Sequence, residues 1–80
     1  MRLPRDVSGD ELARRLGRLG YAVTRQTGSH MRLTTSQPRE HHVTIPKHNP
    51  LSLGTLRSIL DDVAGHRDIT RDQLLTQLFG

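Results

Sequence analysis

The sequence predicts a two-layer α+β domain in which helices cover one face of a three-stranded antiparallel sheet. Three observations support this prediction. The chain has 80 residues, which is below the length at which chains divide, so we expect a single domain over residues 1–80. Apolar residues recur with helical spacing near both ends of the chain and alternate with polar residues in the middle. Short turns separate the alternating segments, which favours antiparallel neighbours.

The first helix is expected to begin after Ser8 and to stop at Gly20. Ser8 and Glu11 have the spacing of a capping box, in which the serine accepts from the Glu11 backbone while the glutamate reaches back. The apolar face carries Leu12, Leu16 and Leu19, and the other face carries Arg14, Arg15 and Arg18. A glycine after the last leucine is a common helix stop.

Three strands are expected at 21–26, 30–35 and 41–46. The first segment is rich in β-forming residues, and in the other two Met31, Leu33, Val43 and Ile45 alternate with polar residues. Residues 27–28 and 36–40 are the turns between them, so the sheet is a meander. Its alternation leaves one face apolar and the other in water, and helices should cover only the apolar face.

Two more helices are expected after the break at Asn49-Pro50. The stripe of the second helix consists of Leu53, Leu56, Ile59, Leu60 and Val63, and it ends near Gly65. Thr70 and Gln73 form another capping box, and a short third helix follows with Leu74, Leu75 and Leu78 on its apolar side.

The charge balance favours a polyanionic partner. Twelve Lys and Arg oppose eight Asp and Glu, which gives a formal net charge of +4. Nucleic acid is the commonest such partner, although a plain soluble basic surface has the same composition. The absence of cysteine excludes thiolate zinc sites and argues against a secreted disulfide scaffold. No apolar run approaches the ~20 residues of a membrane span, so we expect a cytoplasmic protein without membrane contact.

His30 is the strongest candidate for chemistry. If Met31 and Leu33 face the helices, His30 faces the open side of the sheet. Pairing Thr35 with His41 keeps the apolar residues of both strands on one face. That register puts Ser29 beside Lys47 and Gly28 beside His48, so basic residues converge on His30. It also pairs His42 with Thr34, about 13 Å from His30 at ~3.3 Å per residue.

This arrangement suits cleavage of RNA, which supplies its own nucleophile. Attack by the 2′-hydroxyl needs a base, an acid and stabilisation of the phosphorane; His30 could be the base or the acid, and Lys47 with backbone amides could hold the phosphate. Gly28 permits unusual backbone angles and leaves room for a phosphate at the Ser29 amide, or it is an ordinary hairpin glycine. His48 completes an acid/base pair or is plain surface.

Other chemistries fit the pattern less well. A metal site built from His30, His41, His42 and His48 is disfavoured, because neighbouring strand residues point to opposite faces and no helical histidine pair is present. We therefore expect no cofactor. A nucleophilic Ser29 lacks an acidic residue to orient His30.

Four linked segments resemble one protein family. They are Gly20-Tyr21, Arg25-Gln26-Thr27-Gly28-Ser29-His30, Val43-Thr44-Ile45-Pro46-Lys47-His48 and Leu53-Gly54-Thr55-Leu56-Arg57-Ser58-Ile59-Leu60. Together, over roughly residues 8–64, they are similar to the HicA mRNA interferase toxins of type II toxin–antitoxin systems. The resemblance implies a fold like the double-stranded RNA-binding domain, metal-independent cleavage of mRNA and a catalytic histidine that falls on His30. It also implies a HicB antitoxin that covers the active face.

The leading hypothesis is therefore an endoribonuclease toxin that arrests translation. Its catalytic residue would be His30, and its RNA-binding residues would be Gly28, Ser29, Lys47, Arg25, Arg32 and His48. A second hypothesis is a non-catalytic RNA-binding module that contacts phosphate through basic side chains. A third makes the chain mainly an interaction partner whose basic face is complementary to an acidic antitoxin.

Overall fold

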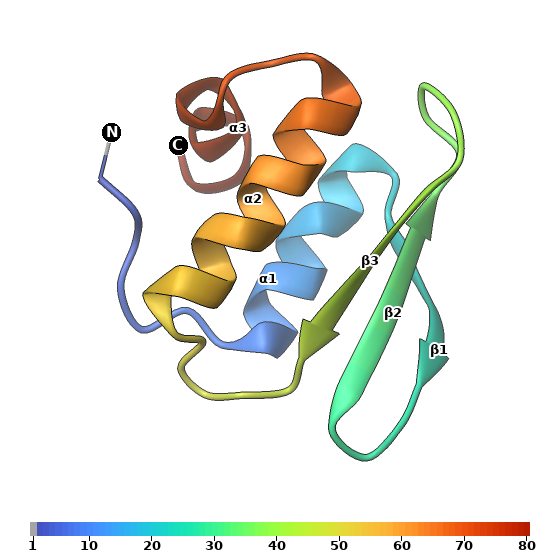
Figure 1. The fold of residues 1–80 in the computed structure, drawn as a ribbon, viewed down its shortest axis with the longest axis vertical. Helices are drawn as coiled ribbons and strands as arrows, with labels where there is room; N and C mark the ends of the chain where they lie inside the picture. The colour runs from blue at the N-terminus through green and yellow to red at the C-terminus, as the bar shows by residue number, and fades with distance from the viewer. Residues whose placement is uncertain (1) are drawn as a thin grey trace.

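A computed structural model describes residues 2–80 and confirms the α+β prediction. The elements are α1 Gly9–Leu16, a 3-10 helix η1 Gly17–Leu19, β1 Ala22–Gln26, β2 His30–Thr35, β3 His41–Pro46, α2 Leu53–Arg67 and α3 Arg71–Phe79 (Figure 1). The second and third strands have the predicted bounds, and the first begins one residue later. The second helix continues two residues past the predicted end at Gly65.

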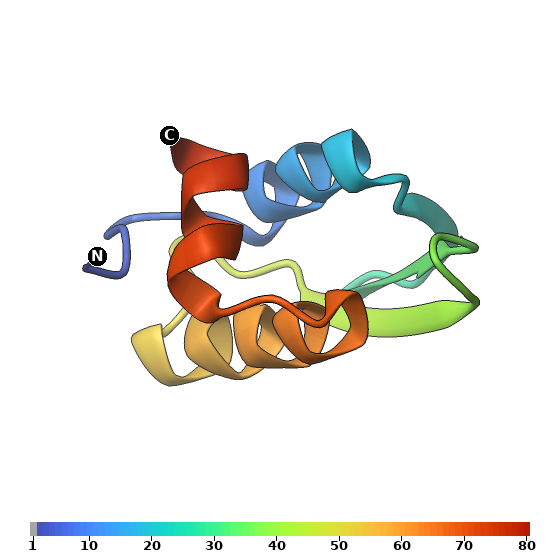
Figure 2. The same ribbon diagram turned by 90° about the horizontal axis from the view of Figure 1, so that it is seen from above.

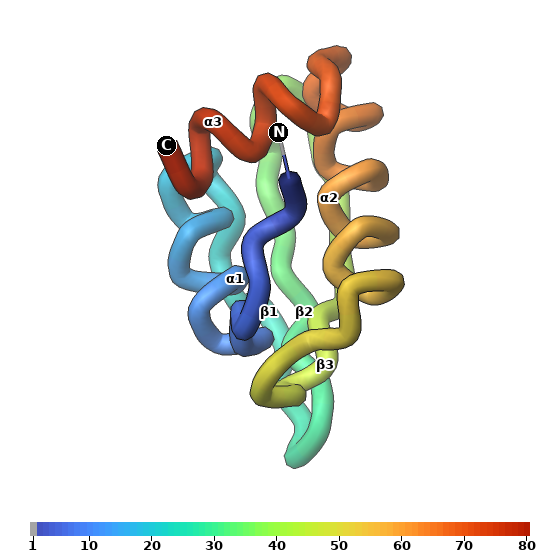
Figure 3. Tube along the Cα trace, turned by 90° about the vertical axis from the view of Figure 1, so that its left-hand side faces the viewer, coloured from blue at the N-terminus to red at the C-terminus, as the bar shows by residue number. Residues whose placement is uncertain are grey.

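The helices lie on one side of the sheet. Seen from above, α1 and α2 lie side by side and the sheet occupies the opposite side of the molecule (Figure 2). The segment that precedes α1 and helix α3 lie on the far side of this helix pair (Figure 3). Within residues 2–80, no helix covers the other face of the sheet. Its polar side is therefore free to meet a ligand.

The strand register agrees with the sequence-based prediction. The strands are antiparallel in the order β1-β2-β3. Across β2 and β3, Met31 pairs with Ile45, Leu33 with Val43 and Thr35 with His41. The four apolar side chains are buried together against the helices. His30 and Arg32 occupy the alternate positions of β2 and are exposed. This alternation fixes which face carries the polar residues.

One residue of the predicted helical stripe is not in the core. The buried core contains Val7, Leu12, Leu16, Tyr21, Met31, Leu33, Val43, Ile45, Leu51, Leu56, Ile59, Leu60, Val63, Ala64, Leu74, Leu75 and Leu78. Leu53 retains 42% of its surface exposed, because it is the first residue of α2, where the stripe runs beyond the sheet. Leu19 packs against the core but is only partly buried.

The helix N-termini are capped as predicted, with one difference. Thr70 and Gln73 form the complete capping box of α3. At α1 the Ser8 hydroxyl accepts from the Glu11 backbone N–H at 3.0 Å, but the Glu11 carboxylate accepts from Nε of Arg15 at 2.9 Å instead of reaching back. The predicted reciprocal box is therefore half formed, because an arginine one turn later offers a charged donor.

Arg15 and Arg18 make contacts that the sequence did not predict. Both donate to the backbone carbonyl of Leu78, at 2.8 and 3.1 Å. The Arg15 guanidinium also lies 4.5 Å from the ring centroid of Phe79. Carbonyl groups at a helix C-terminus carry partial negative charge and attract cations. The two arginines thus fasten the end of α3 to α1.

Gly9 allows α1 to approach the end of β3 closely. A Cβ atom at this position would overlap the backbone carbonyl of Pro46. The Gly9 N–H donates to the carbonyl of His48 at 2.9 Å. The start of α1 therefore fixes the backbone of the segment that follows β3, and this segment carries Lys47.

Candidate active site

His30 is held at the end of a tight turn between β1 and β2. The Thr27 N–H donates to the His30 carbonyl at 2.9 Å, and the His30 N–H donates to the Thr27 hydroxyl at 3.1 Å. Gly28 and Ser29 form the tip between them. We call residues 27–30 the His30 turn. These two hydrogen bonds are local, so the turn closes within four residues.

The tip of the His30 turn has unused backbone donors. Neither the Gly28 N–H nor the Ser29 N–H donates a hydrogen bond within residues 2–80. A Cβ atom at Gly28 would meet nothing within 4 Å, so the space on that side of Gly28 is open. Gly28 does not use the unusual backbone angles that a glycine permits, because the only positive-φ glycine in the described chain is Gly20. What the glycine provides is room.

One ring nitrogen of His30 is engaged and the other is not. The Ser29 hydroxyl lies 2.8 Å from Nδ1 of His30. Within residues 2–80, Nε2 has no hydrogen-bond partner, and the side chain is exposed. If Nδ1–H donates to Ser29, Nε2 is a free base; if the hydroxyl donates to Nδ1, Nε2 carries the proton. The same serine can therefore orient either form of the ring.

Lys47 lies beside the turn as predicted, whereas the backbone at His48 leaves the ladder. The ladder of β2 and β3 ends at His30 and Pro46, and one more hydrogen bond joins the Lys47 N–H to the Ser29 carbonyl at 2.9 Å. The predicted pair of Gly28 and His48 is not part of the ladder. The His48 carbonyl accepts from α1 instead, because the loop must depart toward α2. Both basic side chains are exposed.

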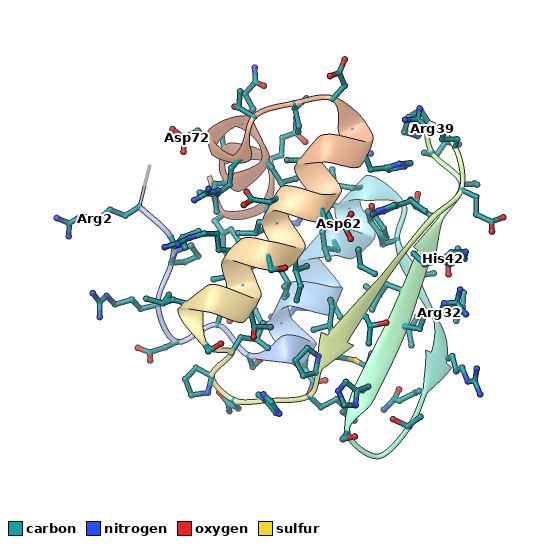
Figure 4. All side chains as sticks on the ribbon, viewed as in Figure 1. Arg2, Arg32, Arg39, His42, Asp62 and Asp72 are labelled. Carbon is teal, nitrogen blue, oxygen red and sulfur yellow. The ribbon has the colours of Figure 1, made fainter. Side chains whose placement is uncertain are left out.

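A β-bulge brings Arg25 to the open face beside Arg32. Strict alternation from the buried Tyr21 would turn Arg25 toward the helices. The register of β1 shifts between Val23 and Arg25, and Arg25 then pairs with Arg32, so that both side chains share a face. Arg32 extends from the sheet away from the helices (Figure 4). The sequence did not reveal this bulge, and without it the two arginines would lie on opposite faces.

His42 is engaged at both ring nitrogens on the same open face. It pairs with Thr34 in the ladder, as predicted. Its Nδ1 lies 2.7 Å from the Thr34 hydroxyl, and its Nε2 donates to the Glu40 carboxylate at 2.9 Å. Because a carboxylate only accepts, Nε2 carries a proton, and in the neutral ring the Thr34 hydroxyl donates to Nδ1. No ring nitrogen remains for chemistry.

A second cluster of titratable groups, which the sequence did not predict, lies at the opposite end of the sheet. We call Tyr21, His41, Asp62 and His66 the His41 cluster. The Tyr21 hydroxyl donates to Nδ1 of His41 at 2.7 Å, and Nε2 of His41 donates to Asp62 at 3.0 Å. The rings of His41 and His66 are stacked at 4.2 Å. The spacing of Asp62 and His66, which puts both on one face of a helix, was the available signal.

The buried environment of the His41 cluster changes the pKa of its tyrosine. Burial, reinforced by the nearby Asp62 carboxylate and partly opposed by Arg67, raises the pKa of Tyr21 to about 12. Tyr21 is 4% exposed, and Nε2 of His66 donates to the Gln37 carbonyl at 3.1 Å. The cluster thus joins the beginning of β1, the beginning of β3 and α2 through closed hydrogen bonds.

The described chain contains no metal centre and no membrane helix. Among residues 2–80, no group of three or more His, Asp or Glu side chains could hold a metal ion. No helix in the same range is long and apolar enough to cross a bilayer.

Comparison with known proteins places this geometry in a family. Residues 9–72 of the 80 match a family model described as the HicA toxin of bacterial toxin–antitoxin systems. The match includes the His30 turn, the whole sheet and α2. No curated protein and no solved structure matches the chain.

Proposed function

The chain belongs to the HicA toxin family, and from this premise we propose that it is an endoribonuclease that cleaves mRNA in the cytoplasm and arrests translation. His30 is the proposed catalytic residue. The observation that carries the proposal is its ring: Nδ1 is held by the Ser29 hydroxyl at 2.8 Å, while Nε2 is free on an exposed, cationic face of the sheet. A positioned imidazole with one free nitrogen is the group that proton transfer at neutral pH requires.

The proposed reaction uses the 2′-hydroxyl of the RNA as nucleophile. Its oxygen forms a bond to phosphorus as the bond to the 5′-oxygen breaks, which leaves a 2′,3′-cyclic phosphate and a 5′-hydroxyl. One proton leaves the 2′-oxygen and one is delivered to the 5′-oxygen. Nε2 of His30 performs one or both of these transfers, and Ser29 keeps the ring oriented in either protonation state.

The phosphate in this reaction would be bound at the tip of the His30 turn. The amides of Gly28 and Ser29 have no hydrogen-bond acceptor within residues 2–80, and paired backbone N–H groups stabilise charge that develops on phosphate oxygens. The Lys47 ammonium adds a mobile positive charge. Arg25, Arg32 and His48 are exposed nearby and would hold flanking phosphates, which position the strand without reading its sequence.

Family membership also implies a HicB-type antitoxin as partner. We propose that it covers the open face of the sheet. This face carries Arg25, Arg32 and His30 and has no covering helix within residues 2–80. An acidic partner seated there would neutralise the phosphate-binding charges and block access to the imidazole at once.

Replacement of the imidazole tests the proposal directly. We expect His30→Ala to lower the rate of RNA cleavage by at least about 100-fold and to leave the circular-dichroism spectrum and unfolding midpoint unchanged. The matched control is His42→Ala, which removes a histidine from the same face and should keep cleavage near the wild-type rate. Undiminished cleavage by His30→Ala would contradict the assignment of the catalytic residue.

Two further measurements separate cleavage from binding. An RNA whose 2′-hydroxyl is replaced by hydrogen at the cleavage site should bind but stay intact, and efficient cutting of it would exclude the proposed nucleophile. A non-catalytic RNA-binding module would retain RNA without product even in the wild-type protein, with affinity that falls as salt rises. The observation that favours this non-catalytic RNA-binding function is the exposed pair Arg25 and Arg32 on one face of the sheet.

A further inference from the structure

A depression of about 470 Å³ lies on the far side of the helix pair from the sheet. It is lined by four arginines and two leucines, Arg2, Leu3, Arg5, Leu53, Arg57 and Arg71. These residues come from the segment before α1, the first turns of α2 and the first residue of α3. We call it the arginine groove. Three separate segments thus build one cationic surface.

Most of the charge in the arginine groove is uncompensated. Arg71 donates to the Asp61 carboxylate, with Nε 2.7 Å from Oδ1 and Nη2 3.5 Å from Oδ2. Within residues 2–80, Arg2, Arg5 and Arg57 form no ion pair. Three like charges around one depression raise its positive potential, and an anion bound between them would relieve their repulsion. The Asp61 contact shows that a carboxylate fits the arginine fork at the edge of this groove.

The arginine groove also exposes apolar surface. Leu53 is 42% exposed, although its position in the helical pattern is that of a core residue. Leu3 packs against the core and is only partly buried. A ligand that offered only phosphate groups would leave this surface in water. A peptide that carries an apolar side chain among its carboxylates would cover it.

We propose that the arginine groove binds an acidic segment of a protein partner. Carboxylates of that segment lie between the guanidinium groups of Arg2, Arg5 and Arg57, and an apolar side chain packs on Leu53. RNA is the less suitable occupant for two reasons. The lining has no aromatic ring on which a base could stack, and the groove lies behind the helices, away from the open sheet face that carries Arg32 (Figures 3 and 4).

The arginine groove is separate from the surface that carries the proposed chemistry. Its lining residues come from the segment before α1, from α2 and from α3, whereas His30 is the first residue of β2, and the sheet lies on the other side of the helix pair (Figure 3). The two surfaces can therefore be occupied independently. A partner segment in the groove would leave the His30 turn accessible, and the proposal does not depend on RNA cleavage.

The test is a titration of the full chain with a fluorescent acidic peptide of sequence Glu-Glu-Leu-Glu-Glu, followed by fluorescence anisotropy. We expect saturable binding that weakens with salt. Arg57→Glu should weaken binding by about tenfold or more, which is about 1.4 kcal/mol. Arg39→Glu is the matched control, because it changes the net charge equally and lies on the opposite side of the molecule from Arg2 (Figure 4). It should change binding by less than about twofold.

Two more variants protect this test from a folding artefact and probe the apolar contact. Arg5→Glu lies in the segment before α1, outside any helix, and should reproduce the loss. Leu53→Ser should lower the affinity of the chain for the leucine-containing peptide by about fivefold. It should have no effect on the same peptide with serine in place of leucine, because that peptide lacks the apolar contact.

The competing explanation, that the groove binds RNA, is tested by measuring the affinity for single-stranded RNA in the His30→Ala background. We expect RNA affinity to fall equally in Arg57→Glu and Arg39→Glu, since both lower the net charge by the same amount. A selective loss of RNA affinity in Arg57→Glu would overturn the proposal and make the groove an RNA site. Equal peptide affinities of Arg57→Glu and Arg39→Glu would overturn it as well, because binding would then reflect net charge alone.

Discussion

A histidine lies at each end of the β2–β3 ladder, and the two histidines have different surroundings. His30 is the first residue of β2 and His41 the first residue of β3, and the strands are antiparallel, so they lie at opposite ends. His30 is exposed, with one ring nitrogen free. Both ring nitrogens of His41 are engaged, and its ring is stacked on His66.

Strand parity accounts for this difference. His41 shares the helix-facing side with Val43 and Ile45 and therefore meets α2, whereas His30 is on the opposite side from Met31 and meets solvent. A histidine whose donors and acceptors are all satisfied is suited to holding elements together. One with a free nitrogen can exchange a proton with a ligand. The comparison thus assigns a structural role to the His41 cluster and the proposed chemical role to the His30 turn.

The largest effect is expected when the tyrosine of the His41 cluster is ionised. The pKa of Tyr21 is raised in the folded chain to about 12 from 10.0, so the folded state retains a proton that the unfolded state loses. This stabilisation is complete below pH 10 and is lost as the pH rises to about 12. It amounts to about 2–3 kcal/mol, which urea unfolding between these pH values would measure.

The composition of the chain provides a direct check on this prediction. Tyr21 is the only tyrosine, and tryptophan is absent, so the phenolate absorbance band reports one residue. Its titration midpoint should lie well above that of free tyrosine. Tyr21→Phe should flatten the pH dependence of unfolding over the same interval. A titration midpoint equal to that of free tyrosine would contradict the burial of Tyr21 in the His41 cluster.

A smaller loss of stability is expected from His41→Ala. This change leaves the buried Tyr21 hydroxyl without its acceptor, which costs about 1–2 kcal/mol. The measurement is the free energy of unfolding in urea. Cleavage by the folded chain should stay within about twofold of wild type, since the cluster is about 16 Å from His30 at ~3.3 Å per residue. A cleavage defect as large as that of His30→Ala, in protein shown to be folded, would break the comparison.

The smallest expected effect concerns Ser29. Ser29→Ala removes the hydroxyl at Nδ1 of His30 and should slow cleavage by about fivefold, equivalent to about 1 kcal/mol. Its stability should change by less than about 0.5 kcal/mol, because the side chain is exposed. The informative readout is the cleavage rate at fixed pH in protein shown to be folded. Ser29→Thr retains a hydroxyl and should restore the wild-type rate.

Much of the fold followed from local pattern. The parity of Met31 and Leu33 predicted the open face, and the register that buried all apolar strand residues was the one observed. The capping signals at Ser8 and Thr70 located two helix starts. These succeed because helix and strand periodicity is a property of a few consecutive residues. The catalytic role of His30 and the phosphate contacts around it stay predictions.

The features that the sequence did not predict depend on tertiary contacts. Arg15 reaches Leu78, which is 63 positions away, and no local pattern contains that information. The bulge before Arg25 depends on how β1 meets β2. Leu53 has the spacing of a core residue but lies where the helix extends past the sheet. The His41 cluster forms only because a residue of β3 stacks on α2. The only signal of it in the sequence was the spacing of Asp62 and His66.

The distribution of contacts along the chain has a consequence for the order of assembly. All strand pairs are sequence neighbours joined by short turns, and the His30 turn closes within four residues. Such local contacts form early in folding, whereas contacts between distant segments form late. The arginine groove requires residues 2–5, the start of α2 and Arg71 together. A chain that is still being completed can therefore possess the geometry of the His30 turn before it possesses the groove.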